Sequence, residues 1–323
     1  MIASTEAPAP IDGRSVLAMY TWAISVATLV AGALVLAFGS PPPLTSAIIM
    51  VVAVALIGLP HGAYDLEVAR RIFAHRLGNA WWLLFGIAYL ALAVLGLGLW
   101  LVLPWVGLTL LLVGGAIHWG LDDLECEHTS RRTRTWLALS RGAIPVASPM
   151  AFHSEAVSTI FSAILGAQEV DASLVRVAGV VWLVLACPGI LASVLWVSHA
   201  APAARLRVLV EPLVLIAWFA VAPPILAFTM YFCFWHSVRH SLRSAMAAAP
   251  GASVRAAITR YLRASALPTV LTWALAAAAV LIWSGLGDAV QLSWSIVFIG
   301  LFALTIPHVT LEWFESRARP AGA

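Results

Sequence analysis

Apolar stretches long enough to cross a lipid bilayer recur along nearly the whole of this 323-residue chain. A helix needs about 20 predominantly apolar residues to cross about 30 Å of hydrocarbon. Apolar residue types make up 62% of the sequence and charged types only 10%, which is far from the composition of soluble proteins. Backbone polar groups inside a bilayer must be hydrogen-bonded within the chain, which favours helices. The sequence therefore predicts an all-α, polytopic integral membrane helix bundle.

Eight to ten transmembrane helices are expected, and ten segments fit the pattern. Their ranges are 15–38, 44–60, 80–103, 105–121, 136–152, 174–199, 207–222, 225–243, 264–285 and 290–307. The fifth has the weakest apolar signal. The first is too long for the apolar core of a secretory signal and has no clear cleavage site, so we expect it to be retained. A single transmembrane domain is predicted over 15–315, between polar tails at 1–14 and 316–323.

The distribution of basic residues predicts an orientation. All 18 basic residues are arginine, against 15 acidic residues. Basic residues concentrate in the cytoplasmic loops of membrane proteins. If the N-terminus and the C-terminus are both cytoplasmic, every arginine except Arg176 lies in a cytoplasmic segment or at the adjoining end of a helix. The stretch 153–171 then falls on the outer side, where its mild amphipathic character predicts that it lies along the interface.

Several classes of function are disfavoured. A net charge of +3 gives no indication of nucleic-acid binding. The absence of lysine excludes a retinal Schiff base of the opsin kind, which needs a lysine amine. Cys126, Cys187 and Cys233 lie far apart without metal-ligand spacing, so we interpret them as small buried or loop residues.

Histidines gather at one end of the even-numbered predicted helices. The five are His61, His118, His236, His240 and His308. His236 and His240, in FWHSVRHS, are four residues apart, so both rings lie on one helical face and can bind one metal ion. The other three each have an acid four residues later: Asp65, Asp122 and Glu312. A carboxylate one turn away can accept the second N–H of a ligand histidine.

A metal site explains this arrangement better than chance. One histidine–acid pair at a membrane edge is usually interfacial, but four helices here deliver imidazoles to the same depth. An unpartnered imidazole in hydrocarbon is costly, and a shared metal would satisfy several at once. Neutral imidazoles suit iron, copper or zinc and disfavour magnesium or calcium. His199 is a reserve candidate, whereas His75, His128 and His153 are interpreted as solvated.

Aromatic residues beside the histidines favour iron with open positions for dioxygen, in an apolar pocket. The candidates for lining that pocket are Trp119, Tyr231, Phe232, Phe234 and Trp235. Ordinary helix packing is the alternative explanation for each of them.

The segments GLPHGAYD, HWGLDD, YFCFWHSVRHS and TIPHVTLEW, between residues 58 and 313, resemble the Brp/Blh family of bacterial membrane β-carotene 15,15′-dioxygenases. One departure is Trp119, where the family's H-F-G has phenylalanine. The resemblance implies an Fe(II) enzyme of the bacterial inner membrane that splits the central double bond of β-carotene with O2 into two molecules of retinal, which could pass to an opsin. It further implies that the domain 15–315 is catalytic and that His61, His118, His236 and His240 hold the iron. His308 also matches a family histidine, which stands beside the ligands or acts as an occasional further ligand.

Three other functions remain open from the residues alone. A di-iron lipid desaturase or hydroxylase would need about eight histidines in clustered boxes, whereas this chain has one H-x-x-x-H. A haem-binding electron carrier would use paired histidines on facing helices. A transporter would relay protons through buried histidine and aspartate. No glycine-rich nucleotide motif is present.

Overall fold

The computed structural model of the chain describes residues 13–123, 131–166, 168–196, 202–283 and 288–318, and the secondary structure there is entirely helical. In chain order the elements are α1 (Gly13–Phe38), α2 (Pro43–Ala53), the π-helix η1 (Val54–Gly58), α3 (Leu59–Ala63), α4 (Asp65–Leu77), the 3-10 turn η2 (Gly78–Ala80), α5 (Trp81–Val102), α6 (Pro104–Asp123), α7 (Arg131–Phe152), α8 (Ser154–Ile164), α9 (Ala172–Trp196), α10 (Pro202–Val221), α11 (Pro224–Thr229), the π-helix η4 (Met230–Ser237), α12 (Val238–Ala248), α13 (Val254–Trp283) and α14 (Ala289–Ala318). The all-α class is confirmed, and helix occupies most of the described part of each of the ten predicted ranges.

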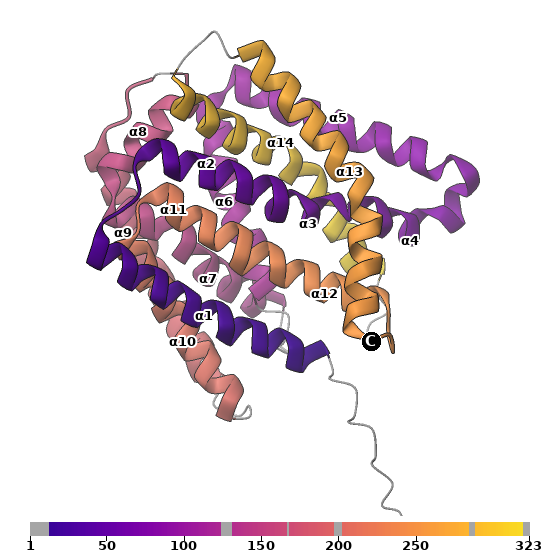
Figure 1. Cartoon of the computed structure of the whole chain (residues 1–323), viewed down its shortest axis with the longest axis horizontal. Coiled ribbons are helices and arrows are strands. Elements are labelled where there is room, and N and C mark those ends of the chain that lie inside the picture. The colour runs from indigo at the N-terminus through magenta and orange to yellow at the C-terminus, as the bar shows by residue number, and fades with distance from the viewer. Residues whose placement is uncertain (1–12, 124–130, 167, 197–201, 284–287, 319–323) are drawn as a thin grey trace, which may run out of the picture.

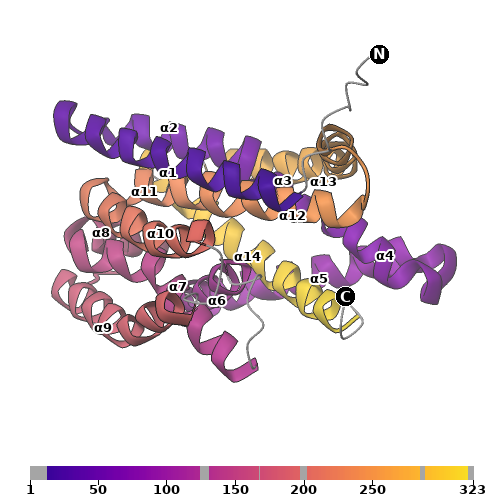
Figure 2. The ribbon, with the colours of Figure 1, turned by 90° about the horizontal axis from the view of Figure 1, so that it is seen from below.

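Most of the long helices lie side by side along the longest dimension of the molecule (Figure 1), and the view from below shows α1 and α2 on the opposite side from α9 (Figure 2). Six helical stretches of the described residues are long and apolar enough to cross a membrane. They are Ser15–Phe38, Pro43–Val102, Pro104–Asp122, Ala172–Ala192, Val254–Ile282 and Ala289–Arg317. The chain is therefore a multi-pass membrane protein, and ten spans remain a prediction.

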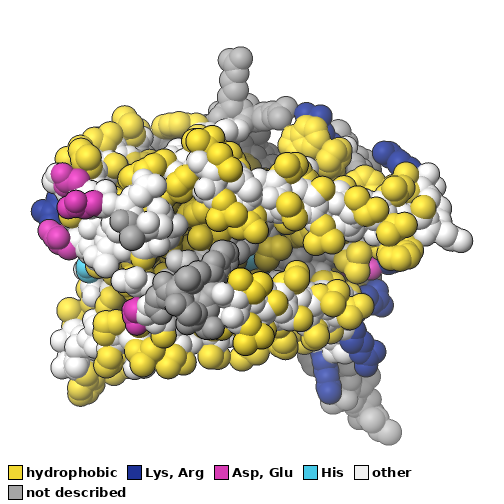
Figure 3. All heavy atoms as spheres, turned by 90° about the horizontal axis from the view of Figure 1, so that it is seen from above, with side chains coloured by type: hydrophobic (Ala, Val, Ile, Leu, Met, Phe, Trp, Pro, Cys, Tyr) yellow, Lys and Arg dark blue, Asp and Glu magenta, His cyan; other side chains and the backbone are white. Residues whose placement is uncertain are grey.

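Charge is distributed unevenly along the bundle. The face in Figure 3 is largely apolar, with arginines mainly at one end and most acidic side chains at the other. The exposed arginines include Arg70 and Arg71 of α4 and Arg260 of α13, whereas Glu155 of α8 and Asp171 are exposed acids. This uneven distribution of charge is expected of a membrane protein whose arginines gather on one side of the bilayer.

Helix α7 has the least apolar sequence of the long helices and is nevertheless enclosed by its neighbours. Its side chains from Leu137 to Met150 are nearly all buried. A β-carbon on Gly142 would lie 1.8 Å from the carbonyl oxygen of Ala116 on α6, and one on Gly120 would lie 1.8 Å from that of Ala138 on α7. Small residues let membrane helices approach to backbone contact. A helix surrounded by protein needs little apolar surface of its own, which explains the weak sequence signal here.

Two helices extend beyond their predicted ends. Helix α13 begins at Val254 rather than at 264, and α14 continues through Pro307 to Ala318, where the sequence predicted an end at 307. An apolar window measures the length of hydrocarbon crossed, whereas helical hydrogen bonding continues into polar residues. As a result, His308 and Glu312 lie on one continuous helix.

The stretch predicted to lie along the outer interface contains α8. Its buried residues include Val157, Ile160 and Ile164, and the helix packs against α14, α9 and α7. Its apolar face is therefore turned into the protein, because α14 and α9 provide a better apolar partner than the interface would.

Candidate metal centre

Irregular backbone brings two of the candidate ligands together. The π-helices η1 and η4 pack against each other; η1 ends three residues before His61, and η4 contains His236. A β-carbon on Gly58 would lie 2.7 Å from Cε1 of Phe232, so glycine is needed for this approach. A π-turn has i→i+5 hydrogen bonds and often occurs at functional sites. The ring centroids of His61 and His236 lie 5.2 Å apart.

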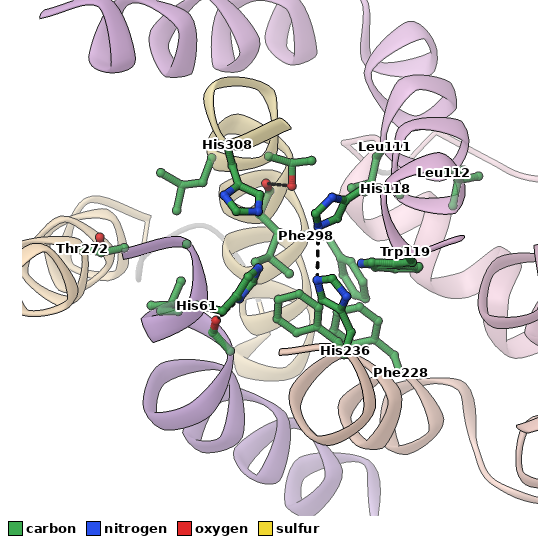
Figure 4. A pocket seen from close by; sticks show the side chains of 18 of the residues that line it. His61, Leu111, Leu112, His118, Trp119, Phe228, His236, Thr272, Phe298 and His308 are labelled. Carbon is green, nitrogen blue, oxygen red and sulfur yellow. Dashed lines mark hydrogen bonds between the residues drawn. The ribbon is translucent and has the colours of Figure 1, made fainter. Parts of the chain in front are cut away.

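Five imidazoles form one compact group, which we call the histidine cluster: His61, His118, His236, His240 and His308. The centroids of neighbouring rings lie 4.8 to 6.3 Å apart. They come from α3, α6, η4, α12 and α14. All are buried except His240, whose side chain is 16% exposed. Figure 4 shows His61, His118, His236 and His308 turned toward one another. The structure thus brings together every histidine that the sequence placed at this depth.

Each imidazole has an oxygen close to its Nδ1. His61 contacts the carbonyl of Gly58, and His308 Nδ1 lies 2.9 Å from both carboxylate oxygens of Asp65. His118 Nδ1 lies 2.9 Å from Glu312 Oε2. Asp122 serves two rings, at 3.4 Å from His236 Nδ1 and 3.3 Å from His240 Nδ1. With Nδ1 oriented in this way, Nε2 is the nitrogen available to a ligand.

The Nε2 atoms approach one another inside the cluster. His118 Nε2 is 3.2 Å from His236 Nε2, and His308 Nε2 is buried without a hydrogen-bond partner among the described residues. Two adjacent imidazole nitrogens, and a third with only Glu312 Oε1 at 3.5 Å, would be costly in an apolar interior. A bound transition-metal ion would satisfy them, and a nitrogen donor set of this kind fits iron, copper or zinc.

Two of the three acids contact other histidines than those predicted from spacing. We expected Asp65 to serve His61 and Asp122 to serve His118, each one turn along the same helix. Instead Asp65 contacts His308, and Asp122 contacts His236 and His240. Glu312 reaches His118 at 2.9 Å, closer than His308 on its own helix at 3.5 Å. Each histidine ring extends into the space between helices, so the nearest carboxylate comes from a neighbouring helix.

His308 lies inside the cluster, where it could act as a further ligand. One ligand atom from each of His61, His118 and His308 can be chosen so that all lie within 4.8 Å of one another, and all three residues are buried. A second such set joins His240 and His308 to Glu312. His240, a proposed ligand by family resemblance, therefore lies at the rim of the cluster, next to carboxylates.

The arginine inside the W-H-S-x-R-H element faces away from the histidines. Arg239 contacts Glu211 of α10 at 3.3 Å and lies over the ring of Trp235. Arg243, one turn later, forms an ion pair with Asp122. Sequence reasoning missed Arg243 as a partner of the site; its spacing of three residues from His240 was the available signal.

A cavity of about 400 Å³ runs past the histidine cluster, within the usual size range of ligand pockets. His61, His118, His236 and His308 line it together with largely apolar side chains. Among the aromatic candidates, Trp119 and Phe232 line the cavity, but Tyr231, Phe234 and Trp235 do not. Sequence reasoning missed five aromatic lining residues: Phe85, Tyr89, Phe161, Phe228 and Phe298. Figure 4 shows Trp119, Phe228 and Phe298 beside the histidines.

Tyr231 and Trp235 pack behind the site. Tyr231 lies against Trp119, with ring centroids 5.2 Å apart, and Trp235 donates from Nε1 to Thr28 Oγ1 of α1 at 2.9 Å. Among the other histidines, His75 is exposed and His153 is half-buried, 2.9 Å from the carbonyl of Phe219. His128 and His199 lie outside the described residues.

A family comparison decides what kind of protein carries this site. The profile described as "Beta-carotene 15,15'-dioxygenase" matches residues 52–315, which include the whole histidine cluster. The chain belongs to the β-carotene 15,15′-dioxygenase family. That family comprises carotenoid-cleaving enzymes, in agreement with the resemblance seen in the motifs.

Individual members of the β-carotene 15,15′-dioxygenase family match over most of the chain. A probable β-carotene 15,15′-dioxygenase, Blh, from Halobacterium salinarum is 29% identical over 293 residues, covering 84% of each protein. A β-carotene 15,15′-dioxygenase from an uncultured marine bacterium is 26% identical over 277 residues, covering 82% of this chain and 92% of the relative. A probable Brp enzyme of Halobacterium salinarum is 29% identical over 306 residues. No solved structure matches.

Proposed function

We propose that this chain cleaves the central C15=C15′ double bond of β-carotene with O2 and releases two molecules of retinal. The observation that carries the proposal is a cluster of five histidines part-way along an apolar cavity, in a member of the β-carotene 15,15′-dioxygenase family. One double bond is replaced by two aldehyde groups, and both oxygen atoms enter the products. The reaction needs neither an electron donor nor a nucleotide.

Iron(II) is the proposed cofactor, held by His61, His118, His236 and His240, with His308 added by its position in the cluster. When bound, the iron supplies the activation of dioxygen that an all-carbon substrate requires. The protein's task is to present imidazole nitrogens to it in fixed orientation. Asp65, Asp122 and Glu312 do so by accepting hydrogen bonds from Nδ1.

The cavity wall positions the substrate. Apolar and aromatic side chains hold a stiff polyene beside the histidines and keep water away from the reacting bond. Trp119 and Phe232 are the predicted aromatic residues in contact with the substrate.

The proposed location is the bacterial inner membrane, with both termini in the cytoplasm. Retinal formed here leaves without a covalent tether, because the chain has no lysine to form a Schiff base. It is then available in the bilayer to an opsin.

Metal analysis of single-alanine variants tests the cofactor. The purified protein should hold about one iron per chain, and His61→Ala, His118→Ala, His236→Ala and His240→Ala should each lose iron and activity. His308→Ala should behave in the same way if His308 is a ligand. His75→Ala, at an exposed position, is the control. Full iron content and normal turnover in His236→Ala would contradict the proposal.

A further inference from the structure

The residues that line the cavity fall into two groups on either side of the histidine cluster, and we call the two parts of the cavity its arms. The first arm lies between α5 and α13, where Gly86, Leu90, Leu271 and Leu275 line it. The second lies among α6, α7, α8 and α11, and its lining includes Leu108, Val146, Val157, Ile164 and Ile225. Figure 4 shows Thr272 of α13 on one side of the histidines, with Leu111, Leu112 and Trp119 of α6 on the other.

The two arms differ in exposure. In the first, Leu90, Leu271 and Leu275 line the cavity and are also 58%, 56% and 64% exposed on the outside of the bundle. In the second, no described lining residue of α6, α7, α8 or α11 is exposed. The first arm is therefore open to the surroundings of the helices, which in a membrane are lipid tails. The second is closed at its far end, and we call it the blind arm.

The blind arm has a definite depth. Leu108 and His118 both line the cavity and stand ten residues apart on α6, as do Phe298 and His308 on α14. At the helical rise of 1.5 Å per residue, each spacing corresponds to about 15 Å along the helix axis. This depth is comparable with one half of an extended carotenoid measured from its central bond.

We propose that carotenoid enters end-first from the bilayer between α5 and α13, and that the blind arm holds its leading half, so that the depth of this arm selects the double bond presented to the histidines. The inference rests on the proposed function. It explains how a cavity with one open and one closed arm can address the centre of a symmetric substrate. One end reaches the closed wall of α8, and the middle then lies at the cluster.

Two glycines allow each arm to be narrowed without rebuilding the fold. Gly115 lines the blind arm, and a β-carbon there would meet only the Trp119 ring, at 3.6 Å. Gly86 lines the open arm, with nothing within 4 Å of its β-carbon position. The matched controls are Gly114→Leu on α6 and Gly98→Leu on α5, since neither glycine lines the cavity and neither has a neighbour within 4 Å.

Filling the blind arm should selectively lower the rate at which the long substrate is cleaved. In vesicles containing β-carotene, Gly115→Leu should lower retinal formation about tenfold or more, and the remaining products should include unequal aldehydes from off-centre cleavage. The cleavage rate of a shortened carotenoid that lacks one ring should fall much less, because its truncated end fits the shallower arm. Val157→Phe, at the α8 end of the arm, provides a second filling variant if Gly115→Leu does not fold.

A binding measurement on the iron-free protein separates entry from chemistry. Gly86→Leu should slow the uptake of β-carotene from vesicles about tenfold and leave the final stoichiometry unchanged, whereas Gly98→Leu should match the unmodified protein. If the unmodified protein forms no retinal, the proposed function fails, yet uptake still tests the entry route. Once the unmodified protein is seen to form retinal, it is compared with folded Gly115→Leu and Val157→Phe. Equal rates and equal products in all three would show that the depth of the blind arm does not select the bond that is cleaved. Normal uptake by Gly86→Leu would overturn the entry route.

Discussion

Asp65 and His308 are 243 residues apart in the chain, yet both carboxylate oxygens of Asp65 lie 2.9 Å from Nδ1 of His308. The tyrosine hydroxyl of Tyr89 also donates to Asp65, at 3.0 Å. The pair therefore fixes the orientation of a buried imidazole through a carboxylate that is itself held in place. Partners of this kind commonly affect metal affinity or activity by about 10- to 100-fold.

Asp65→Asn should accordingly lower retinal formation or iron affinity about 10- to 100-fold without abolishing either. The amide keeps the size of the carboxylate but loses the charge that strengthens the hydrogen bond from His308. Iron titration of the purified variant and chromatography of its products measure the two effects.

Glu67→Gln is the matched control for Asp65→Asn. Glu67 lies on the same helix, two residues later, and forms an ion pair with Arg70 at the surface. Surface pairs contribute little, so activity should stay close to that of the unmodified protein. Equal activity in Asp65→Asn and Glu67→Gln would show that the contact with His308 has no role.

Asp122→Asn should be more damaging than Asp65→Asn. Asp122 faces His236 and His240 and forms an ion pair with Arg243, so its charge supports two rings and balances a largely buried cation. Removing one partner of a buried pair costs about 3–5 kcal/mol. The thermal midpoint of the purified protein in detergent should fall together with activity.

A double variant separates these two effects of Asp122. Adding Arg243→Gln to Asp122→Asn removes the cation as well, so thermal stability should recover in part while retinal formation stays low. Recovery of full activity in the double variant would mean that Asp122 acts only through stability and does not orient histidines.

The contact between α6 and α7 predicts opposite results for two neighbouring glycines. Gly120→Ala places a methyl group against the carbonyl of Ala138 and should destabilise the bundle by at least about 1–3 kcal/mol. Gly114→Ala on the same helix meets nothing within 4 Å and should be neutral or stabilising, since alanine favours helix by about 1 kcal/mol. Thermal unfolding monitored by size-exclusion chromatography distinguishes them. Equal midpoints would contradict the close packing.

Reporter fusions test the proposed orientation. Fusions at residue 132 and at the C-terminus should both report the cytoplasm, and a fusion near Ser162 should report the outer side. An external C-terminus would require an odd number of spans and would separate the arginine-rich end of the bundle from the cytoplasm.

The positions of the helices were predictable because crossing hydrocarbon requires a minimum apolar length, which a sequence states directly. The same assignment of helices predicted that the five histidines lie at a common depth in the membrane. Helix α7 was the weakest prediction, because its sequence reflects protein neighbours such as Ala116 rather than lipid. The ends of α13 and α14 were missed because helices continue past the apolar window.

The contacts within the site were harder to predict. Which acid meets which histidine depends on how helices are rotated against each other, and spacing along one helix does not contain that information. The π-helix η4 adds to this difficulty, because its wider turn changes which side chains share a face. Phe232 therefore lines the cavity while Tyr231 and Trp235 pack behind it.

Product analysis of the purified, iron-loaded protein with β-carotene in air is the direct test of central cleavage. Retinal should be the main product, with two molecules formed for each β-carotene consumed, and all of it should disappear in His236→Ala. Longer apocarotenals in place of retinal would show that a different bond faces the histidine cluster, and unchanged β-carotene with folded, iron-loaded protein would contradict the proposed function.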